Sequence, residues 1–210
     1  MKTVLVTGGT TRLGAGIAAR LRKEGWTVLT SSHRPDAGAD LVADLTDPMG
    51  PARLYAAVLE RLGGNPPTAL VNNAALFVGD DARLAALNFE APKRLTMLMA
   101  GRETGRGAVV NILDTRVLGE SEEAKDAYSR SKRRLLDYTR SSAALYGETL
   151  TVNGVAPGPV LAPTAVHESA GELLVERPSV EDVAAAVCFL LSVPSVTGAV
   201  VPVDGGQHLL

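Results

Sequence analysis

Short apolar runs rich in β-branched residues alternate with helix-length amphipathic stretches along the whole chain. The first run covers residues 4–6, and a helical pattern follows over residues 13–24, where Gly25 ends it. The same succession repeats to the end of the chain. Strand, helix and strand at this spacing predict crossover units in a parallel sheet with both faces covered. We therefore expect an α/β fold with a doubly wound parallel sheet.

The remaining elements follow the same alternation. The other expected strands cover residues 26–30, 41–43, 69–72, 108–113, 150–155 and 200–203. The other expected helices cover residues 51–62, 82–100, 127–146 and about 179–191, the last opened by a near-capping box of Ser179 and Asp182. No low-complexity linker or repeat of solenoid length separates these elements. One domain over residues 1–210 is therefore predicted.

Composition and charge exclude several classes of function. The 210 residues carry a formal net charge of -2, from 21 basic and 23 acidic side chains, which gives no global basic field for nucleic acid or anionic lipid. One cysteine and three scattered histidines predict no disulfide framework and no metal site. The start lacks a leader pattern and no apolar run approaches the ~20 residues of a membrane span. We expect a cytoplasmic protein with a small-molecule partner and no membrane partner.

A glycine-rich segment, Thr7-Gly8-Gly9-Thr10-Thr11-Arg12-Leu13-Gly14, lies between the first expected strand and helix. Backbone N–H groups at such a helix N-terminus can bind a pyrophosphate, and glycine lets the backbone approach it closely. An ordinary tight turn would also carry glycines, but Rossmann-type folds bind dinucleotides at this position. The positive charge of Arg12 is unfavourable at the positive, N-terminal end of the helix dipole. Its presence there therefore indicates a negatively charged partner such as a phosphate.

The residues at the end of the second strand indicate whether the dinucleotide is NAD or NADP. An acidic residue there would bind the ribose hydroxyls of NAD, whereas basic groups accommodate the 2′-phosphate of NADP. The chain reads Thr30-Ser31-Ser32-His33-Arg34, with no acid before Asp36. Hydroxyl, imidazole and guanidinium groups suit a phosphate, although a surface loop could also be basic by chance. NADPH is the predicted cofactor, with His33 and Arg34 among its ligands.

Four further segments complete a resemblance to the short-chain dehydrogenases/reductases. The glycine turn resembles that family's Thr-Gly-x-x-x-Gly-x-Gly, with Arg12 where the family usually has glycine. Asp44-Leu45, Asn72-Asn73-Ala74-Ala75, Pro157-Gly158 and Val203-Asp204-Gly205-Gly206 match its later motifs, with Ala75 in place of a glycine. The resemblance spans Thr7 to Gly206. It implies cofactor binding by Gly8, Arg12, Leu13, Gly14, Asp44, Leu45, Asn73, Ala74, Ala75, Pro157 and Gly158.

A tyrosine and a lysine lie four residues apart in Tyr128-Ser129-Arg130-Ser131-Lys132, which puts them on one face of the expected helix. An ammonium beside a phenol lowers the phenol pKa and suits acid–base work, although most such pairs are solvated neighbours. The resemblance implies that this is the catalytic pair, that both residues contact the cofactor, and that Asn88 supports Lys132 through water. Asn88 could instead bond locally within its helix.

Asp114 stands where most of the family has a serine. Two other interpretations remain. Asp114 could be an ordinary residue at the end of a strand in an inactive enzyme, or Thr115, one position later, could supply the hydroxyl group in place of the serine. Pteridine reductases, however, share an aspartate at the Asp114 place, an arginine at the Arg12 place and a His-Arg pair like His33-Arg34. The chain therefore resembles a pteridine reductase or its bacterial dihydromonapterin-reductase relative, with Asp114 and Tyr128 as catalytic residues.

The resemblance also implies a substrate site. Phe77 would stack on a pterin that lies against the nicotinamide, and Arg12, Asp114 and Tyr128 would contact the same ring. Alternatives are a general carbonyl or 3-oxoacyl thioester reductase and an NADPH-binding regulator without turnover. Only about 20 residues, 159–178, are available for a lid over the substrate, so we expect an open site. Family resemblance alone predicts a homotetramer.

Overall fold

The protein is described by a computed structural model that covers residues 2–103, 105–119, 126–160 and 177–210. Within these ranges the strands form one sheet in the order β3-β2-β1-β4-β5-β6-β7, and every pairing is parallel. The strands are β1 (Thr3–Thr7), β2 (Thr27–Ser32), β3 (Leu41–Val42), β4 (Ala69–Asn72), β5 (Gly107–Ile112), β6 (Leu150–Pro157) and β7 (Val200–Val203).

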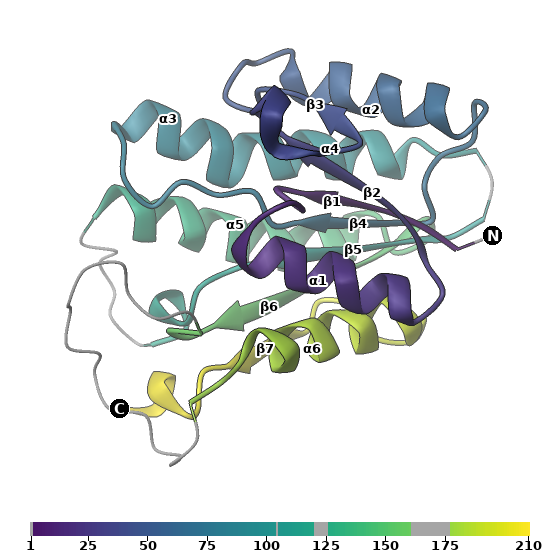
Figure 1. The fold of residues 1–210 in the computed structure, drawn as a ribbon. Helices are drawn as coiled ribbons and strands as arrows, with labels where there is room; N and C mark the ends of the chain where they lie inside the picture. Colours follow the sequence, from purple (N-terminus) through teal and green to yellow (C-terminus); the bar gives the residue numbers. More distant parts are fainter. Residues whose placement is uncertain (1, 104, 120–125, 161–176) are drawn as a thin grey trace.

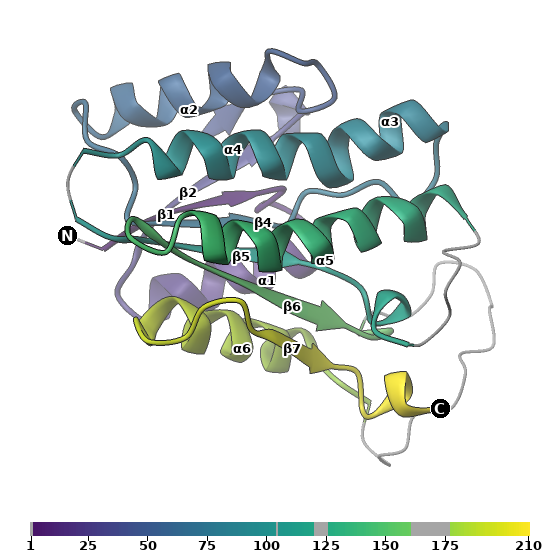
Figure 2. The same ribbon diagram turned by 180° about the vertical axis from the view of Figure 1, so that it is seen from behind.

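Helices cover both faces of the sheet (Figure 1). Helices α1 (Arg12–Lys23) and α6 (Val180–Ser192) pack together on one face, while α2 (Gly50–Arg61), α4 (Ala91–Ala100) and α5 (Ala127–Leu145) cover the other (Figure 2). The predicted doubly wound α/β fold is confirmed, and most expected elements end within about two residues of the observed ones. No helix in the described ranges is long and apolar enough to cross a membrane.

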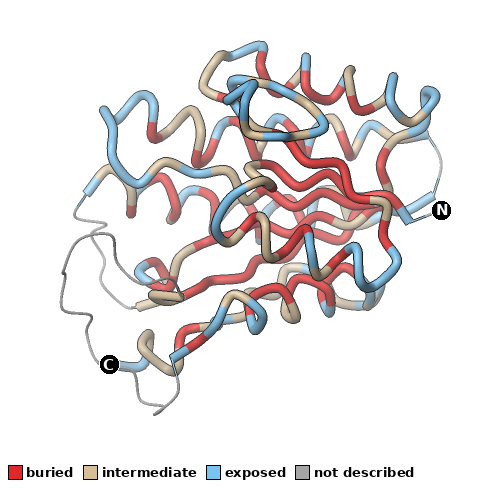
Figure 3. Tube along the Cα trace, viewed as in Figure 1, coloured by how far each residue is buried: buried red, intermediate tan, exposed pale blue. Residues whose placement is uncertain are grey.

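The central strands read as continuous apolar runs because both of their faces are buried (Figure 3). Along β1, Val4 and Val6 point into the core shared with α1 and α6, where Ile17 also lies. Leu5, between them, points into the core on the opposite face, together with Leu95 of α4. Alternate side chains of one strand therefore join two separate cores.

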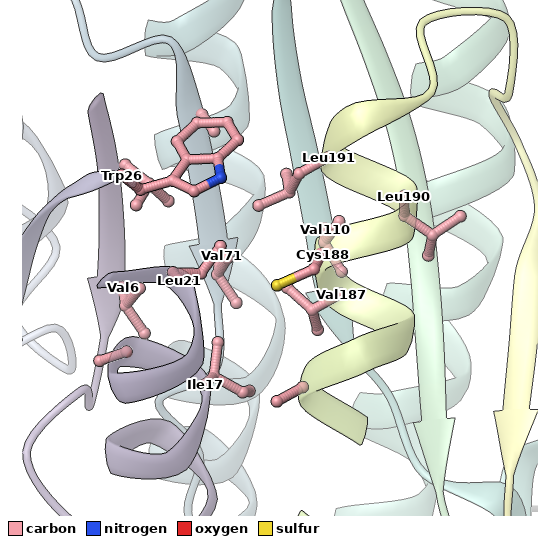
Figure 4. Close-up of a cluster of buried hydrophobic side chains, with 14 of the residues drawn as sticks. Val6, Ile17, Leu21, Trp26, Val71, Val110, Val187, Cys188, Leu190 and Leu191 are labelled. Atoms are coloured by element: carbon pink, nitrogen blue, oxygen red, sulfur yellow. The ribbon is translucent and has the colours of Figure 1, made fainter. Parts of the chain in front are cut away.

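The core between α1 and α6 contains the chain's only tryptophan and only cysteine (Figure 4). Trp26 lies between α1 and β2 and belongs to the same cluster as Leu21, Cys188 and Leu191. Burial raises the pKa of the Cys188 thiol, which keeps it protonated and unreactive. Cys188 is a packing residue.

The helix predicted over residues 82–100 is present, but its middle part is not a regular α-helix. The structure has a short helix, α3 (Asp81–Ala85), then a π-helical turn over Ala86–Glu90, and then α4. Pro92 at the start of α4 has no N–H and cannot complete the regular hydrogen-bond ladder with the preceding turn. The wider turn accommodates this gap and contains Asn88.

The sheet reverses its direction of growth between β1 and β4. From β1 the chain adds β2 and β3 on one side, and from β4 it adds β5, β6 and β7 on the other. In open parallel sheets, ligands bind beyond the carboxyl ends of the strands at such a switch point. The connections after β1 and β4 therefore lie where a ligand is expected to bind.

Packing across the α1–α6 core predicts the result of a core truncation. Leu21 is fully buried, so Leu21→Ala should lower the free energy of unfolding by about 2–5 kcal/mol. Leu145 is 71% exposed at the end of α5, and Leu145→Ala should change it by about 0.5 kcal/mol or less. Urea unfolding of both variants measures the difference, and equal losses would contradict this description of the core.

Candidate active site

The ends of β1 and β4 are joined by side-chain hydrogen bonds. The Thr7 hydroxyl accepts the backbone amides of Asn73 and Ala74, each at 3.0 Å. The Asn73 side-chain amide donates in turn to the carbonyls of Thr7 at 2.9 Å and Gly8 at 3.1 Å. These bonds hold the two connections of the switch point against each other.

The glycine turn packs too closely for larger residues. A Cβ atom added to Gly14 would lie 2.1 Å from the Gly8 carbonyl oxygen, and Gly8 itself has a φ of +62°. Arg12 has a φ of 51° and is the one non-glycine residue with positive φ in the described ranges. This left-handed conformation costs a non-glycine residue about 1 kcal/mol or more and is found mostly at functional positions.

The N-terminus of α1 is available to an anion. Thr11 precedes the helix but its side chain accepts no capping hydrogen bond, and the first turn contains no acidic residue. The first amides of a helix have no acceptor within the helix, and they carry the positive end of its dipole. With Arg12 beside them, these amides form a site suited to a phosphate group.

The end of β2 presents donors and no acid to the cleft. Ser32, His33 and Arg34 line it. The nearby Asp40 does not line the cleft, and its Oδ2 accepts the amide of Thr30 at 2.8 Å and the Thr30 hydroxyl at 2.7 Å. The residues fit a 2′-phosphate better than a free ribose diol.

Asp44 begins the connection after β3 and lines the same cleft. Its Oδ1 accepts the hydroxyl of Thr46 at 2.7 Å and the amide at 2.9 Å. These hydrogen bonds lower the pKa of the Asp44 carboxyl, and the proximity of His33 adds to the effect. Asp44 is therefore an ionised acceptor at the rim of the cleft.

One cleft of about 920 Å³ contains all of the predicted cofactor-binding residues. They are Gly8, Arg12, Leu13, Gly14, His33, Arg34, Asp44, Leu45, Asn73, Ala74, Ala75, Tyr128, Lys132, Pro157 and Gly158. Pro159 and Val160 of the predicted lid also line it. Residues 161–176 of that predicted lid lie outside the described residues.

The cleft suits a phosphorylated dinucleotide on three counts. It has an uncapped helix N-terminus, cations at the end of β2, and glycines where a side chain would collide with the turn. The same cleft reaches Asp114, Tyr128 and Lys132, so a dinucleotide in it would extend to the acid–base groups.

Asp114 and Tyr128 form a direct pair. The Tyr128 hydroxyl donates to Asp114 Oδ2 at 2.8 Å, and the Arg116 amide donates to Oδ1 at 2.9 Å. Burial raises the pKa of Tyr128 well above its ordinary value, and the neighbouring Asp114 carboxylate raises it further. The expected lowering of the Tyr128 pKa by Lys132 is therefore wrong, and the phenol stays protonated.

Lys132 is a buried amine, 3% exposed, with Nζ 5.9 Å from the centre of the Tyr128 ring. It donates to the carbonyl of Ile112 at 2.8 Å, at the end of β5. Burial lowers the pKa of Lys132 to about 8, against a smaller opposite effect from Asp114. Loss of solvation thus outweighs the favourable charge nearby.

Asn88 does not touch Lys132 directly. Its side chain accepts the Leu76 amide and donates to the Leu76 carbonyl, both at 2.8 Å, and donates to the Ser131 hydroxyl at 3.0 Å. Ser131 immediately precedes Lys132 on α5. Asn88 therefore joins the connection after β4 to the helix that contains the tyrosine–lysine pair.

The Thr115 hydroxyl does not face the cleft. It is buried and donates to the carboxylate of Asp204, so it is not a surviving catalytic hydroxyl one position later. Phe77 is 57% exposed, so it does not pack in the core of the chain. Its ring lies 4.7 Å from that of Tyr128, and the Arg116 guanidinium lies 5.0 Å from it.

Sequence reasoning missed two cleft residues from the helical segment after β4. Arg83 and Leu87 both line the cleft. Their spacing of four residues puts them on one side of a helix, and Leu87 directly precedes Asn88. That spacing was the signal that could have identified Arg83 as a further cation near the cofactor.

The buried amine predicts a pH effect on stability. Between the pKa of about 8 in the folded protein and 10.5 when unfolded, the unfolded chain binds more protons at Lys132, so stability rises with pH. From pH 7 to 9.5 this contributes about 2 kcal/mol. Lys132→Met should remove that contribution in urea unfolding, whereas Lys23→Met, on the surface, should keep it. The same pH dependence in all three proteins would contradict the burial argument.

The chain is similar to known proteins over nearly its whole length. Residues 10–208 match the family model described as enoyl-(acyl carrier protein) reductase. Protein FixR of Bradyrhizobium diazoefficiens is 31% identical over 99% of this chain and 87% of that protein. Dihydromonapterin reductase of Shigella flexneri is 26% identical over 98% of this chain and 96% of that protein.

A solved structure adds the cofactor. FolM alternative dihydrofolate reductase 1 of Brucella canis, complexed with NADP, superimposes with a TM-score of 0.85. It is 29% identical, and the match covers 99% of this chain and 94% of that one. NADP(H) is the cofactor that this likeness and the donor set of the cleft both support. The chain belongs to the short-chain dehydrogenase/reductase family of oxidoreductases.

Proposed function

We propose that the protein catalyses the NADPH-dependent reduction of a pterin at the oxidised or dihydro level. The observation that carries the proposal is the 2.8 Å hydrogen bond from the Tyr128 hydroxyl to Asp114. Asp114 occupies the position at which most of the family has a serine. Similarity to an alternative dihydrofolate reductase and to dihydromonapterin reductase supports the same substrate class.

Tyr128 and Asp114 would carry out the proton transfer. Because burial and the carboxylate keep the phenol protonated, Tyr128 can donate a proton to the ring being reduced. Asp114 accepts the Tyr128 hydroxyl hydrogen bond and lines the cleft, so it can return a proton from solvent to the phenol. The bound cofactor supplies the hydride.

The cofactor would be held along the whole cleft. His33 and Arg34 would bind the 2′-phosphate, and the N-terminus of α1 with Arg12 the pyrophosphate. Lys132 would bind the nicotinamide ribose from its buried position between Ile112 and Tyr128. Asn88 would support that lysine through the neighbouring Ser131.

The pterin would lie between the nicotinamide and the exposed ring of Phe77. Stacking on this ring, which already contacts Tyr128 at 4.7 Å, adds about 0.5–1.5 kcal/mol beyond buried area. Arg12 would reach a polar edge of the pterin from the glycine turn. The proposal also includes a homotetramer, which the family resemblance implies, and a cytoplasmic location.

The substrate class is tested by exchanging the distinguishing residue. The parent protein should oxidise NADPH with dihydrobiopterin, dihydromonapterin or dihydrofolate, and only slowly with an acetoacetyl thioester. Asp114→Ser should lower pterin turnover by about 10²–10⁴-fold, the scale of lost acid–base catalysis, and raise ketone turnover. Asp137→Ser, on the exposed face of α5, is the matched control and should change neither rate.

Three results would overturn this proposal. Unchanged pterin rates in Asp114→Ala would remove the role of the carboxylate. Preference of the parent protein for the thioester would assign a 3-oxoacyl reductase, and NADPH binding without turnover of any substrate would assign a regulator.

Cofactor selectivity is tested at the end of β2. Arg34→Ala should weaken NADPH binding by about 1.5–3 kcal/mol, the scale of a charge-assisted hydrogen bond, and leave NADH binding nearly unchanged. Arg53→Ala serves as the matched control, because Arg53 is an exposed arginine paired with Asp47 and is not part of the cleft. Titration of NADPH and NADH by fluorescence measures both affinities. Equal affinity of the parent protein for the two would refute the assignment of Arg34.

A further inference from the structure

A buried polar cluster lies just behind the acid pair. Asp204 follows β7 directly and is 3% exposed. Its Oδ2 accepts the Thr115 hydroxyl and the amide of His208 at 2.9 Å, and lies 2.7 Å from His208 Nδ1. Its Oδ1 accepts the Gly206 amide at 3.0 Å. We call Thr115, Asp204 and His208 the C-terminal clamp.

The clamp contacts the turn that contains Asp114. Thr115 opens the short helical turn Thr115–Val117, and Asp114 caps that turn by accepting the Arg116 amide. Asp114 and Thr115 are consecutive in the chain, and each is held by a different partner. Asp114 is bonded to Tyr128 across the cleft, and Thr115 to Asp204 behind it.

The clamp also contacts the cofactor side of the cleft. Gly158 lines the cleft and donates its amide to the Val203 carbonyl at 3.0 Å. A Cβ atom on Gly158 would lie 2.9 Å from both the Cα and the Cβ of Asp204. The last residues of the chain thus pack directly against two walls of the site.

The carboxylate of the clamp is ionised and its acceptors are occupied. Burial opposes the charge on Asp204, but hydrogen bonds from Thr115, His208 and Gly206 outweigh it and hold its pKa below the ordinary value. A buried charge with several donors is rigid, because moving any donor leaves it unsatisfied.

We propose that Thr115, Asp204 and His208 are positioning residues that hold Asp114 within hydrogen-bond distance of Tyr128. This inference rests on the proposed role of Asp114 in the reductase reaction. None of the three touches the reacting atoms. Their effect is to fix the turn, because a shift of about 1 Å in a supporting element is enough to cost a catalytic group about a hundredfold in rate.

The test removes the Thr115 hydroxyl and keeps its shape. Thr115→Val should lower kcat for the pterin by about tenfold or more, with the dissociation constant for NADPH within about twofold of the parent. Thr115→Ser keeps the hydroxyl and should restore most of kcat. Thr197→Val, which removes a hydroxyl that accepts the Val152 amide near the start of β6, should leave kcat unchanged.

A second measurement does not depend on the substrate. Amide hydrogen exchange of Arg116, Val117 and Leu118 reports the order of the turn, since these amides bond to Asp114 and Thr115. Exchange should accelerate about tenfold or more in Thr115→Val and in Asp204→Asn, and stay near the parent rate in Thr115→Ser.

The outcomes separate the two proposals. If the parent turns over no pterin, the proposed function fails, while faster exchange in Thr115→Val still supports the clamp. Parent-like exchange and parent-like kcat in both Thr115→Val and Asp204→Asn would overturn the clamp. Equal losses of kcat in Thr115→Val and Thr115→Ser would also overturn it, because the hydroxyl would then be irrelevant.

Discussion

The hydrogen bonds between the ends of β1 and β4 are the constraint on which the site depends. Thr7 and Asn73 join the two connections where the sheet reverses, so the glycine turn and the segment leading to Asn88 are held together. Backbone groups at this edge need partners once buried, and side chains of the neighbouring strand supply them. The cleft forms at this point because the connections after β1 and β4 lead to opposite faces of the sheet, and the helices on either side leave the switch point uncovered.

Burial governs the electrostatics of the acid–base groups. Lys132 and Tyr128 are four residues apart, yet the loss of solvation dominates the pKa of each in the structure. The phenol is held protonated and the amine loses its charge more easily than in water. A protonated phenol next to a carboxylate suits proton donation.

Sequence reasoning identified the parallel sheet and the cleft residues because both depend on local patterns. Apolar runs of strand length and a glycine turn carry their own signals, and Tyr128 and Lys132 share one helix face. The π-helical turn at Ala86–Glu90 accompanies Pro92 and leaves no mark on the apolar spacing, whereas the direction of the Tyr128 pKa depends on packing between distant segments. The same holds for Thr115, whose partner Asp204 is 89 residues away, so no local pattern could show that its hydroxyl faces away from the cleft.

Arg12 combines two unfavourable features in one residue. Its φ of 51° lies in the left-handed region, and its charge stands at the positive end of the α1 dipole. A glycine would remove both costs, and the neighbouring Gly8 and Gly14 already serve the tight approach of the turn. Within the described ranges, Arg12 forms no ion pair that would offset these costs. Its compensation must come from an anionic or polar ligand in the cleft that Arg12 lines, which is where the cofactor phosphates and the proposed pterin would meet.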